Sequence, residues 1–163
     1  MRSAESKILS RESARAIVGN LKHEGKRVVL ANGCFDMLHV GHVRYLSAAK
    51  REGDILVVAV NADSSVRGLK GPGRPILDEH ARLQLIASLR DVDYVVAFSE
   101  PSVEALLQEL RPDVHAKGTD YTSGTVPERD ASARLGIRIA IVGDPKNHST
   151  RAFLDTIRKA PHG

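Results

Sequence analysis

The residues best suited to chemistry lie in the segment NGCFDMLHVGH, from Asn32 to His42. His39 and His42 flank Gly41 and stand close together, so at the start of a helix both imidazoles can point at one group. A phosphoryl oxygen that gains negative charge during substitution is the natural target of such a pair. A lone histidine is more often an incidental surface or capping residue. A pair that flanks glycine, directly after a strand and a G-x-F-D turn, favours a functional site instead.

Zinc binding is the other chemistry open to paired histidines. A zinc site needs about three or four protein ligands, and no Cys or Glu lies at supporting spacing nearby. We therefore expect no metal ligated by these side chains. The chain has one cysteine, Cys34, which excludes an internal disulfide and fits a reducing compartment.

Two glycines make this segment suitable for holding phosphate. Gly33 and Gly41 let the backbone come close to a nucleotide, since a Cβ at either place could obstruct it. A strand that leads into a helix also places free N–H groups, and the positive end of the helix dipole, where an anion can bind.

The elements that must position this segment alternate between strand and helix. Apolar runs predict strands at 27–32, 54–60, 94–98, 113–116 and 137–142. Apolar residues at helical spacing predict helices at about 11–24, 41–52, 78–89, 101–110, 127–135 and 150–160. Glycine and proline predict a loop at 64–77, and the polar stretch 117–126 predicts another.

Repeated strand–helix units predict the α/β class. We expect a Rossmann-like, doubly wound parallel sheet of about five strands with helices on both faces. Ligands of such sheets sit beyond the carboxyl ends of the strands, where strand order reverses. Here that places a ligand at the loops after residues 32, 60, 116 and 142.

Length and composition narrow the class of protein. The 163 residues fit one domain, with residues 1–7 expected to be flexible. No apolar run approaches the ~20 residues that cross a bilayer, and the polar start has no secretory signal, so we expect a cytoplasmic protein with no membrane partner. The net charge is +4, but Lys and Arg are scattered and no helix carries a basic stripe interleaved with aromatics. We therefore expect no nucleic-acid partner.

The segment GCFDMLHVGH resembles the signature of the cytidylyltransferase-like nucleotidyltransferase superfamily, whose mark is H-x-G-H. Within it, the chain is most similar to the D-glycero-β-D-manno-heptose 1-phosphate adenylyltransferase domain of ADP-heptose synthase. The similarity is nearly full-length. It includes KILSRE at 7–12, HVGHVRYL at 39–46, VVAVNADSSVRGLKGPGRPI at 57–76, DVDYVVAF at 91–98, RPDVHAKGTDY at 111–121 and HST at 148–150.

This resemblance implies an adenylyltransferase that transfers AMP from ATP to a sugar 1-phosphate and releases pyrophosphate, with Mg²⁺ as cofactor. It implies catalytic roles for His39, His42 and Lys70, which would contact phosphates. The residues implied in nucleotide binding are Asn32, Gly33, Cys34, Phe35, Asp36, Gly41, Lys117, Gly118, Asp120, Ser149 and Thr150. Those implied in substrate binding are Asn61, Asp63, Arg74, Arg82, Tyr121 and Arg151.

Some features depart from the usual family pattern and leave the acceptor open. Thr119 replaces a glycine, Arg151 replaces a second threonine, and 145–148 differs from an acidic-glycine turn. A glycerol-3-phosphate cytidylyltransferase is an alternative, although Asp144 stands where that branch carries an arginine. A nucleotide-binding module without turnover is another. The resemblance also implies a homodimer, a role in lipopolysaccharide biosynthesis, and a separate sugar kinase that supplies the acceptor, because the domain is often fused to one.

Overall fold

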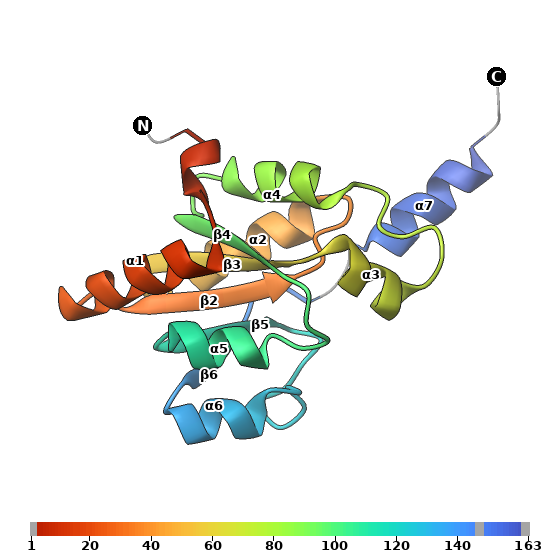
Figure 1. The fold of residues 1–163 in the computed structure, drawn as a ribbon. Helices are drawn as coiled ribbons and strands as arrows, with labels where there is room; N and C mark the ends of the chain where they lie inside the picture. Colours follow the sequence, from red (N-terminus) through yellow and green to blue (C-terminus); the bar gives the residue numbers. More distant parts are fainter. Residues whose placement is uncertain (1–2, 146–148, 161–163) are drawn as a thin grey trace.

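The computed structural model describes residues 3–145 and 149–160 and has a parallel sheet at its centre, with helices on both faces (Figure 1). The sheet has six strands in the order β1-β4-β3-β2-β5-β6. Their bounds are β1 (Ile8–Leu9), β2 (Val28–Gly33), β3 (Ile55–Asn61), β4 (Tyr94–Phe98), β5 (Val114–Gly118) and β6 (Arg138–Val142). The predicted fold class is confirmed.

Helices lie between successive strands, and the last helix follows β6. They are α1 (Arg11–His23), α2 (Val40–Lys50), α3 (Asp63–Lys70), α4 (Glu79–Ala87), α5 (Glu104–Leu110), α6 (Arg129–Leu135) and α7 (Thr150–Lys159), and a short 3-10 helix spans Glu5–Lys7. Helix α7 extends away from the sheet (Figure 1).

The sheet separates two apolar cores because neighbouring strand residues point to opposite faces. In β2, Val29 packs with the buried residues of α2 and α4, whereas Leu30 packs with those of α1 and α5. Both side chains are fully buried. Burial on both faces explains why the strands appear in the sequence as continuous apolar runs.

Strand order fixes where a ligand can bind. From β2 the chain builds outward through β3 to β4, and then crosses to the other side of β2 to add β5 and β6. Strand order therefore reverses between β2 and β5, and a crevice is expected beyond the carboxyl ends of these strands. The paired histidines follow β2, and the Lys117–Tyr121 segment begins in β5.

The number of strands and the segment after β3 differ from expectation. The sheet has six strands because Ile8–Leu9 pair with β4, a strand too short to produce a periodic pattern. Residues 63–70 form α3, where a loop was expected from 64 onward, and the loop begins only at Gly71, with φ 86°. Gly68 lowers the helix propensity of this segment, but the burial of Val66 outweighs that cost.

A short segment near the start of the chain contacts the body of the fold. Within the 3-10 helix, the Lys7 ammonium donates to the carbonyls of Leu89 and Val92 at 3.1 and 2.8 Å. These bonds attach the start of the chain to the segment between α4 and β4.

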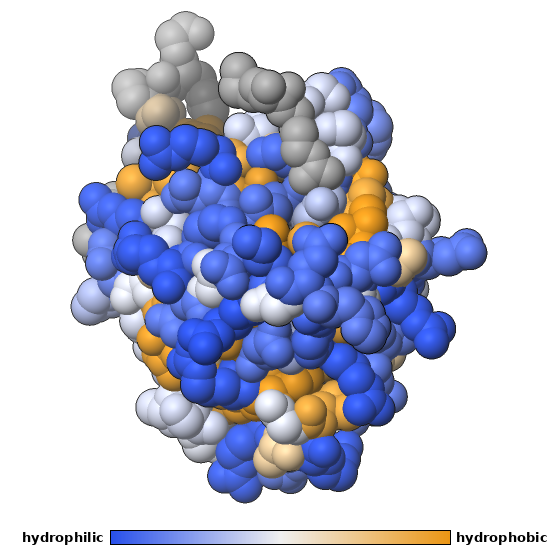
Figure 2. Space-filling view, turned by 90° about the vertical axis from the view of Figure 1, so that its left-hand side faces the viewer, coloured by the Kyte–Doolittle hydropathy of each residue, from blue (hydrophilic) through white to orange (hydrophobic). Residues whose placement is uncertain are grey.

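Two surface properties bear on partners. Within the described residues, no helix is long and apolar enough to cross a membrane. The face at the amino ends of the strands, opposite the expected crevice, is mainly hydrophilic with small separate apolar areas (Figure 2).

Candidate functional site

The turn between β2 and α2 reverses direction through two residues in the left-handed region, Phe35 at φ 50° and Met37 at φ 64°. Such angles are unfavourable for residues with a Cβ, so the surrounding structure must hold them. The Phe35 ring is 4% exposed and anchors the turn in the core. A Cβ on Gly33 would lie 3.1 Å from this ring, so the end of β2 has little room for a larger residue.

His39 and His42 cap the amino end of α2. The His39 Nδ1 accepts from the Gly41 N–H at 3.1 Å, and the His42 Nδ1 accepts from the His39 N–H at 3.3 Å. The two rings stack with centroids 3.8 Å apart. A ring nitrogen that accepts a hydrogen bond carries no proton, so each neutral ring holds its proton on Nε2. The capping arrangement therefore makes both Nε2 atoms hydrogen-bond donors.

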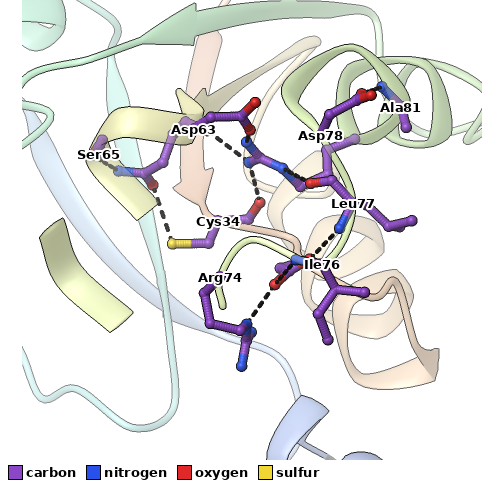
Figure 3. Close-up of polar contacts among 11 residues, drawn as sticks. Cys34, Asp63, Ser65, Arg74, Ile76, Leu77, Asp78 and Ala81 are labelled. Carbon is purple, nitrogen blue, oxygen red and sulfur yellow. Dashed lines mark hydrogen bonds and ion pairs between the residues drawn. The ribbon is translucent and has the colours of Figure 1, made fainter. Parts of the chain in front are cut away.

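The Asp36 carboxylate lies behind this turn and binds the loop that follows α3. Its side chain is fully buried and accepts from Arg74 Nε at 2.7 Å and from the N–H groups of Ile76 and Leu77 at 3.0 Å (Figure 3). Burial alone would raise the pKa of Asp36, but the two backbone donors and the guanidinium together lower it. Its oxygens are thus committed to protein donors that join the 74–77 loop to the histidine turn.

Arg82, which the resemblance implies in substrate binding, lies in the interior and is bound by protein groups. It has no exposed surface, and its Nε donates to the Leu77 carbonyl at 3.0 Å. One terminal nitrogen donates to the carbonyls of Cys34 and Asn61 at 2.7 and 2.6 Å, and the other pairs with Asp63 at 2.8 Å (Figure 3). The hydrogen bonds of the guanidinium therefore join the ends of β2 and β3 to the loop before α4.

The predicted residues after β3 divide between the interior and the surface. The Asn61 amide donates to Ser65 at 2.9 Å and accepts from the Cys34 thiol at 3.8 Å. Burial raises the pKa of that thiol, although the positive charges of Lys70 and Arg82 nearby oppose the shift. Lys70 is exposed at the end of α3, and its positive charge is near enough to act on the Cys34 thiol.

At the carboxyl end of β5, Lys117 is held by a partner that the sequence-based prediction missed. Its ammonium lies 3.7 Å from Glu128 Oε2 and 4.6 Å from the centre of the Tyr121 ring. Lys117 and Glu128 are 6% and 5% exposed, so this ion pair is buried at the end of β5. A Cβ on Gly118 would meet Asp120 at 2.9 Å, which keeps the following turn tight.

His115 is the second functional candidate that the prediction missed. It lies in β5 with no exposed surface, and its Nε2 is 3.0 Å from Asn32 Oδ1 at the end of β2. Burial is the main cause that lowers its pKa to about 3, and the charge of Lys117 adds to the effect. Neither His115 nor Glu128 stands out in sequence, because only strand pairing and helix packing bring them to the predicted residues.

Helix α7 is attached to the histidine turn by its first residues. The Thr150 hydroxyl donates to the Asp36 carbonyl at 2.8 Å, and the Ser149 hydroxyl accepts from the Ala152 N–H at 3.1 Å as an N-cap. Arg151 is exposed beside them. Part of the predicted departure at 145–148 lies outside the described residues, which omit 146–148.

Thr119, another departure from the family pattern, makes a contact that a glycine could not provide. Its hydroxyl donates to the Asp144 carbonyl at 2.7 Å, and the Asp144 carboxylate lies 3.6 Å from the Arg44 guanidinium on α2. These bonds join the loops after β5 and β6 to the amino half of α2.

The structure therefore gathers most predicted site residues at one edge of the sheet. Some of them stand at the ends of helices, and others lie in the interior. His39 and His42 stand at the start of α2, with Thr150 behind their turn and Lys70 at the end of α3. Asp36 and Arg82 organise the loops from inside. Within the described residues, no group of three or more His, Cys, Asp or Glu could hold a metal ion. Such an edge is suited to an anionic ligand held by N–H donors and cations.

Comparisons with known sequences agree with this geometry. The bifunctional protein HldE of Syntrophotalea carbinolica is 44% identical over 153 residues, which are 94% of this chain and 31% of that protein. The bifunctional protein HldE of Azotobacter vinelandii is 41% identical over 158 residues, covering 97% of this chain and 33% of that protein. The chain thus spans about a third of the length of these curated relatives.

This chain is also similar to solved structures. The lipopolysaccharide core biosynthesis protein from Thermoplasma volcanium matches with a TM-score of 0.64 and 32% identity, over 75% of this chain and 100% of that one. The pantoate-beta-alanine ligase from Francisella tularensis shares the fold, with a TM-score of 0.69 at 17% identity over 90% of this chain and 72% of that one. The family model described as cytidylyltransferase-like matches residues 30–152. The predicted superfamily is confirmed, and the chain belongs to the cytidylyltransferase-like family.

Proposed function

We propose that this chain is an adenylyltransferase that transfers AMP from ATP to D-glycero-β-D-manno-heptose 1-phosphate, giving ADP-heptose and pyrophosphate. The family and the relatives support nucleotidyl transfer to a sugar phosphate. The observation that carries the proposal is the capped pair of His39 and His42, whose Nε2–H groups lie at the amino end of α2.

The two histidines act on the α-phosphate of the nucleotide. An acceptor phosphate oxygen attacks the α-phosphorus, forming one P–O bond while the bond to the β-phosphate oxygen breaks and pyrophosphate leaves. The acceptor oxygen is already anionic, so the reaction needs no general base. Catalysis then consists of holding two anions in line and stabilising the charge that grows on the transferred group. The preset Nε2–H donors require no reorganisation during the reaction.

Cationic side chains complete the anion-binding edge in this proposal. Lys70, exposed at the last residue of α3, closes over the outer phosphates, and Arg151 at the start of α7 faces the acceptor. Arg74 uses its Nε for Asp36, and its Nη2 is buried with no hydrogen-bond partner among the described residues. A buried donor without a partner is costly, so Arg74 is suited to bind an oxygen of a ligand that closes on this loop.

We propose that ATP enters as its magnesium complex. The described residues offer no cluster of three or more metal-binding side chains, and the Asp36 oxygens are committed to protein donors. Mg²⁺ keeps most of its water and phosphate ligands in nucleotide sites, so it needs few ligands from the protein. The ion here would neutralise the triphosphate, and the chain would supply the donors around it.

Pyrophosphate release tests the reaction. The assay pairs ATP, CTP or GTP, each with Mg²⁺, with heptose 1-phosphates of both anomers or with glycerol 3-phosphate. Rapid release with ATP and the β-heptose 1-phosphate alone is the expected result. Release only with CTP and glycerol 3-phosphate would overturn the assignment of substrates. Tight nucleotide binding without release from any pair would indicate a module without turnover.

Histidine variants test the mechanism. His39→Ala and His42→Ala should each reduce kcat by about 10²–10³, the cost of removing one donor to developing charge. His23→Ala is the matched control, because His23 is exposed at the far end of α1 and lies outside the site. Near-full turnover in either site variant, in a chain that remains folded, would refute the mechanism.

Two further parts of the proposal concern partners. We propose that the acceptor is made by a separate sugar kinase and that the chain forms a homodimer. Light scattering on the purified chain gives the oligomeric state directly. Adding a heptose kinase with unphosphorylated heptose and ATP should start pyrophosphate release only when both proteins are present.

A further inference from the structure

The contact between His115 and Asn32 joins the buried interior to the ligand-binding edge. Leu30 of β2 pairs with His115 of β5, so Asn32 lies two residues further along β2 on the same face of the sheet. The His115 ring has no exposed surface, whereas Asn32 is only half-buried. Their contact, at 3.0 Å, therefore connects a buried group to one that ligand can reach.

The proton of His115 must lie on the nitrogen that faces Asn32. The ring is neutral at physiological pH, because burial lowers its pKa to about 3. Its Nδ1 is buried and has no hydrogen-bond partner among the described residues. A proton there would be a buried donor without an acceptor, which is rarer and more costly than an unused lone pair. The proton on Nε2 instead donates to the Asn32 amide oxygen.

This bond fixes which end of the Asn32 carboxamide meets a ligand. The oxygen points inward to His115, so the amino group on the other branch of the planar amide points away from that ring. Lys117 stands on the same face of β5 two residues beyond His115. Asn32 and Lys117 thus stand at the ends of β2 and β5, the two strands between which the strand order reverses.

We propose that His115 is a positioning residue, which holds the Asn32 carboxamide so that its amino group donates to an oxygen of the bound nucleotide. The inference rests on the proposed function. Without His115 the amide can rotate by half a turn and present its oxygen. An amide oxygen in that place repels a phosphate oxygen, or leaves a sugar hydroxyl oxygen without the hydrogen bond that the amino group gave it. Nucleotide binding therefore weakens although Asn32 itself is unchanged.

A double-mutant cycle tests the coupling. The variants are His115→Leu, His115→Gln, Asn32→Ala and the pair His115→Leu with Asn32→Ala. The measured quantity is the Kd of the magnesium complex of α,β-methylene ATP, by calorimetry, so no acceptor or turnover is needed. His115→Leu should weaken binding by about tenfold, the size of one hydrogen bond to a charged group. His115→Gln should restore most of the affinity, because a glutamine amide nitrogen can replace Nε2.

The coupling separates positioning from a general loss of structure. In the Asn32→Ala background, His115→Leu should cause no further loss, because the group that it positions is gone. Equal losses from His115→Leu in both backgrounds would overturn the inference. An equally weak His115→Gln in a folded chain would also overturn it. If the wild-type chain binds no nucleotide, the proposed function fails, and the inference fails with it.

A second variant leaves His115 unchanged. Asn32→Asp keeps an oxygen to accept from His115 and replaces the amino group with an oxygen. It should weaken binding at least as much as Asn32→Ala, so the test remains valid even if His115→Leu does not fold. Affinity that is unchanged in Asn32→Asp would show that the amino group does not face the nucleotide.

Discussion

The burial of His115 predicts a specific loss of stability in acid. In the folded chain burial lowers its pKa to about 3, against the ordinary value of 6.5 in the unfolded chain. The unfolded state therefore binds a proton that the folded state excludes. The contribution of His115 to stability is fully present above the unfolded pKa and is lost progressively as pH falls from 6.5 toward 3.

The magnitude follows from the size of this interval. Each pH unit below the unfolded pKa and above the folded one costs about 1.4 kcal/mol of unfolding free energy. Lowering the pH from about 7 to about 5 crosses roughly 1.5 units of that interval, so His115 alone should remove about 2 kcal/mol. Small domains are stable by only about 5–15 kcal/mol, which makes the loss measurable.

Urea unfolding at the two pH values is the assay. His115→Gln keeps a donor for Asn32 but does not titrate, so its free energy of unfolding should fall by about 2 kcal/mol less than that of the wild type. His23→Gln is the control, because His23 is exposed and should leave the wild-type pH dependence in place. Equal losses in wild type and His115→Gln would refute the reasoning, since they would mean that the buried ring accepts a proton in the folded chain.

Other substitutions test the packing of the fold and the support of the site. For each variant the measurement is its free energy of unfolding. Arg82→Met should cost about 3–5 kcal/mol because it leaves buried acceptors unpaired, whereas Arg90→Met, on a 94% exposed side chain, should change stability by less than about 0.5 kcal/mol. Gly53→Ala should cost about 1–3 kcal/mol, since its Cβ would lie 2.8 Å from a backbone oxygen. Gly19→Ala, in an open helical position, should gain about 0.5–1 kcal/mol. Thr150→Val should cost about 1 kcal/mol by removing its bond to the histidine turn. Results of opposite sign would contradict the packing described.

The sequence determined the fold class and the position of the site. Apolar runs mark five of the strands, because a strand that is buried on both faces is apolar throughout. Helical periods mark the helices between them, because a helix that is buried on one face repeats its apolar residues with the helical period. The H-x-G-H segment pointed to the amino end of α2 as the candidate site, and the structure places both histidines there. Local patterns failed at β1, which is too short to show a period, and at α3, whose glycine suggested a loop.

Only the tertiary structure decided which polar side chains are exposed at the candidate site and which support it from inside. Arg82 and Lys70 both looked like phosphate ligands, yet Arg82 is buried against carbonyls far away in sequence, whereas Lys70 is exposed. His115 and Glu128 gave no signal, because their roles come from the partners that sheet pairing and helix packing bring to them. Burial and the choice of partner are properties of contacts between distant segments. A pattern of neighbouring residues records the type of a side chain, but the free energy of its charge or hydrogen bond depends on what the folded chain places around it.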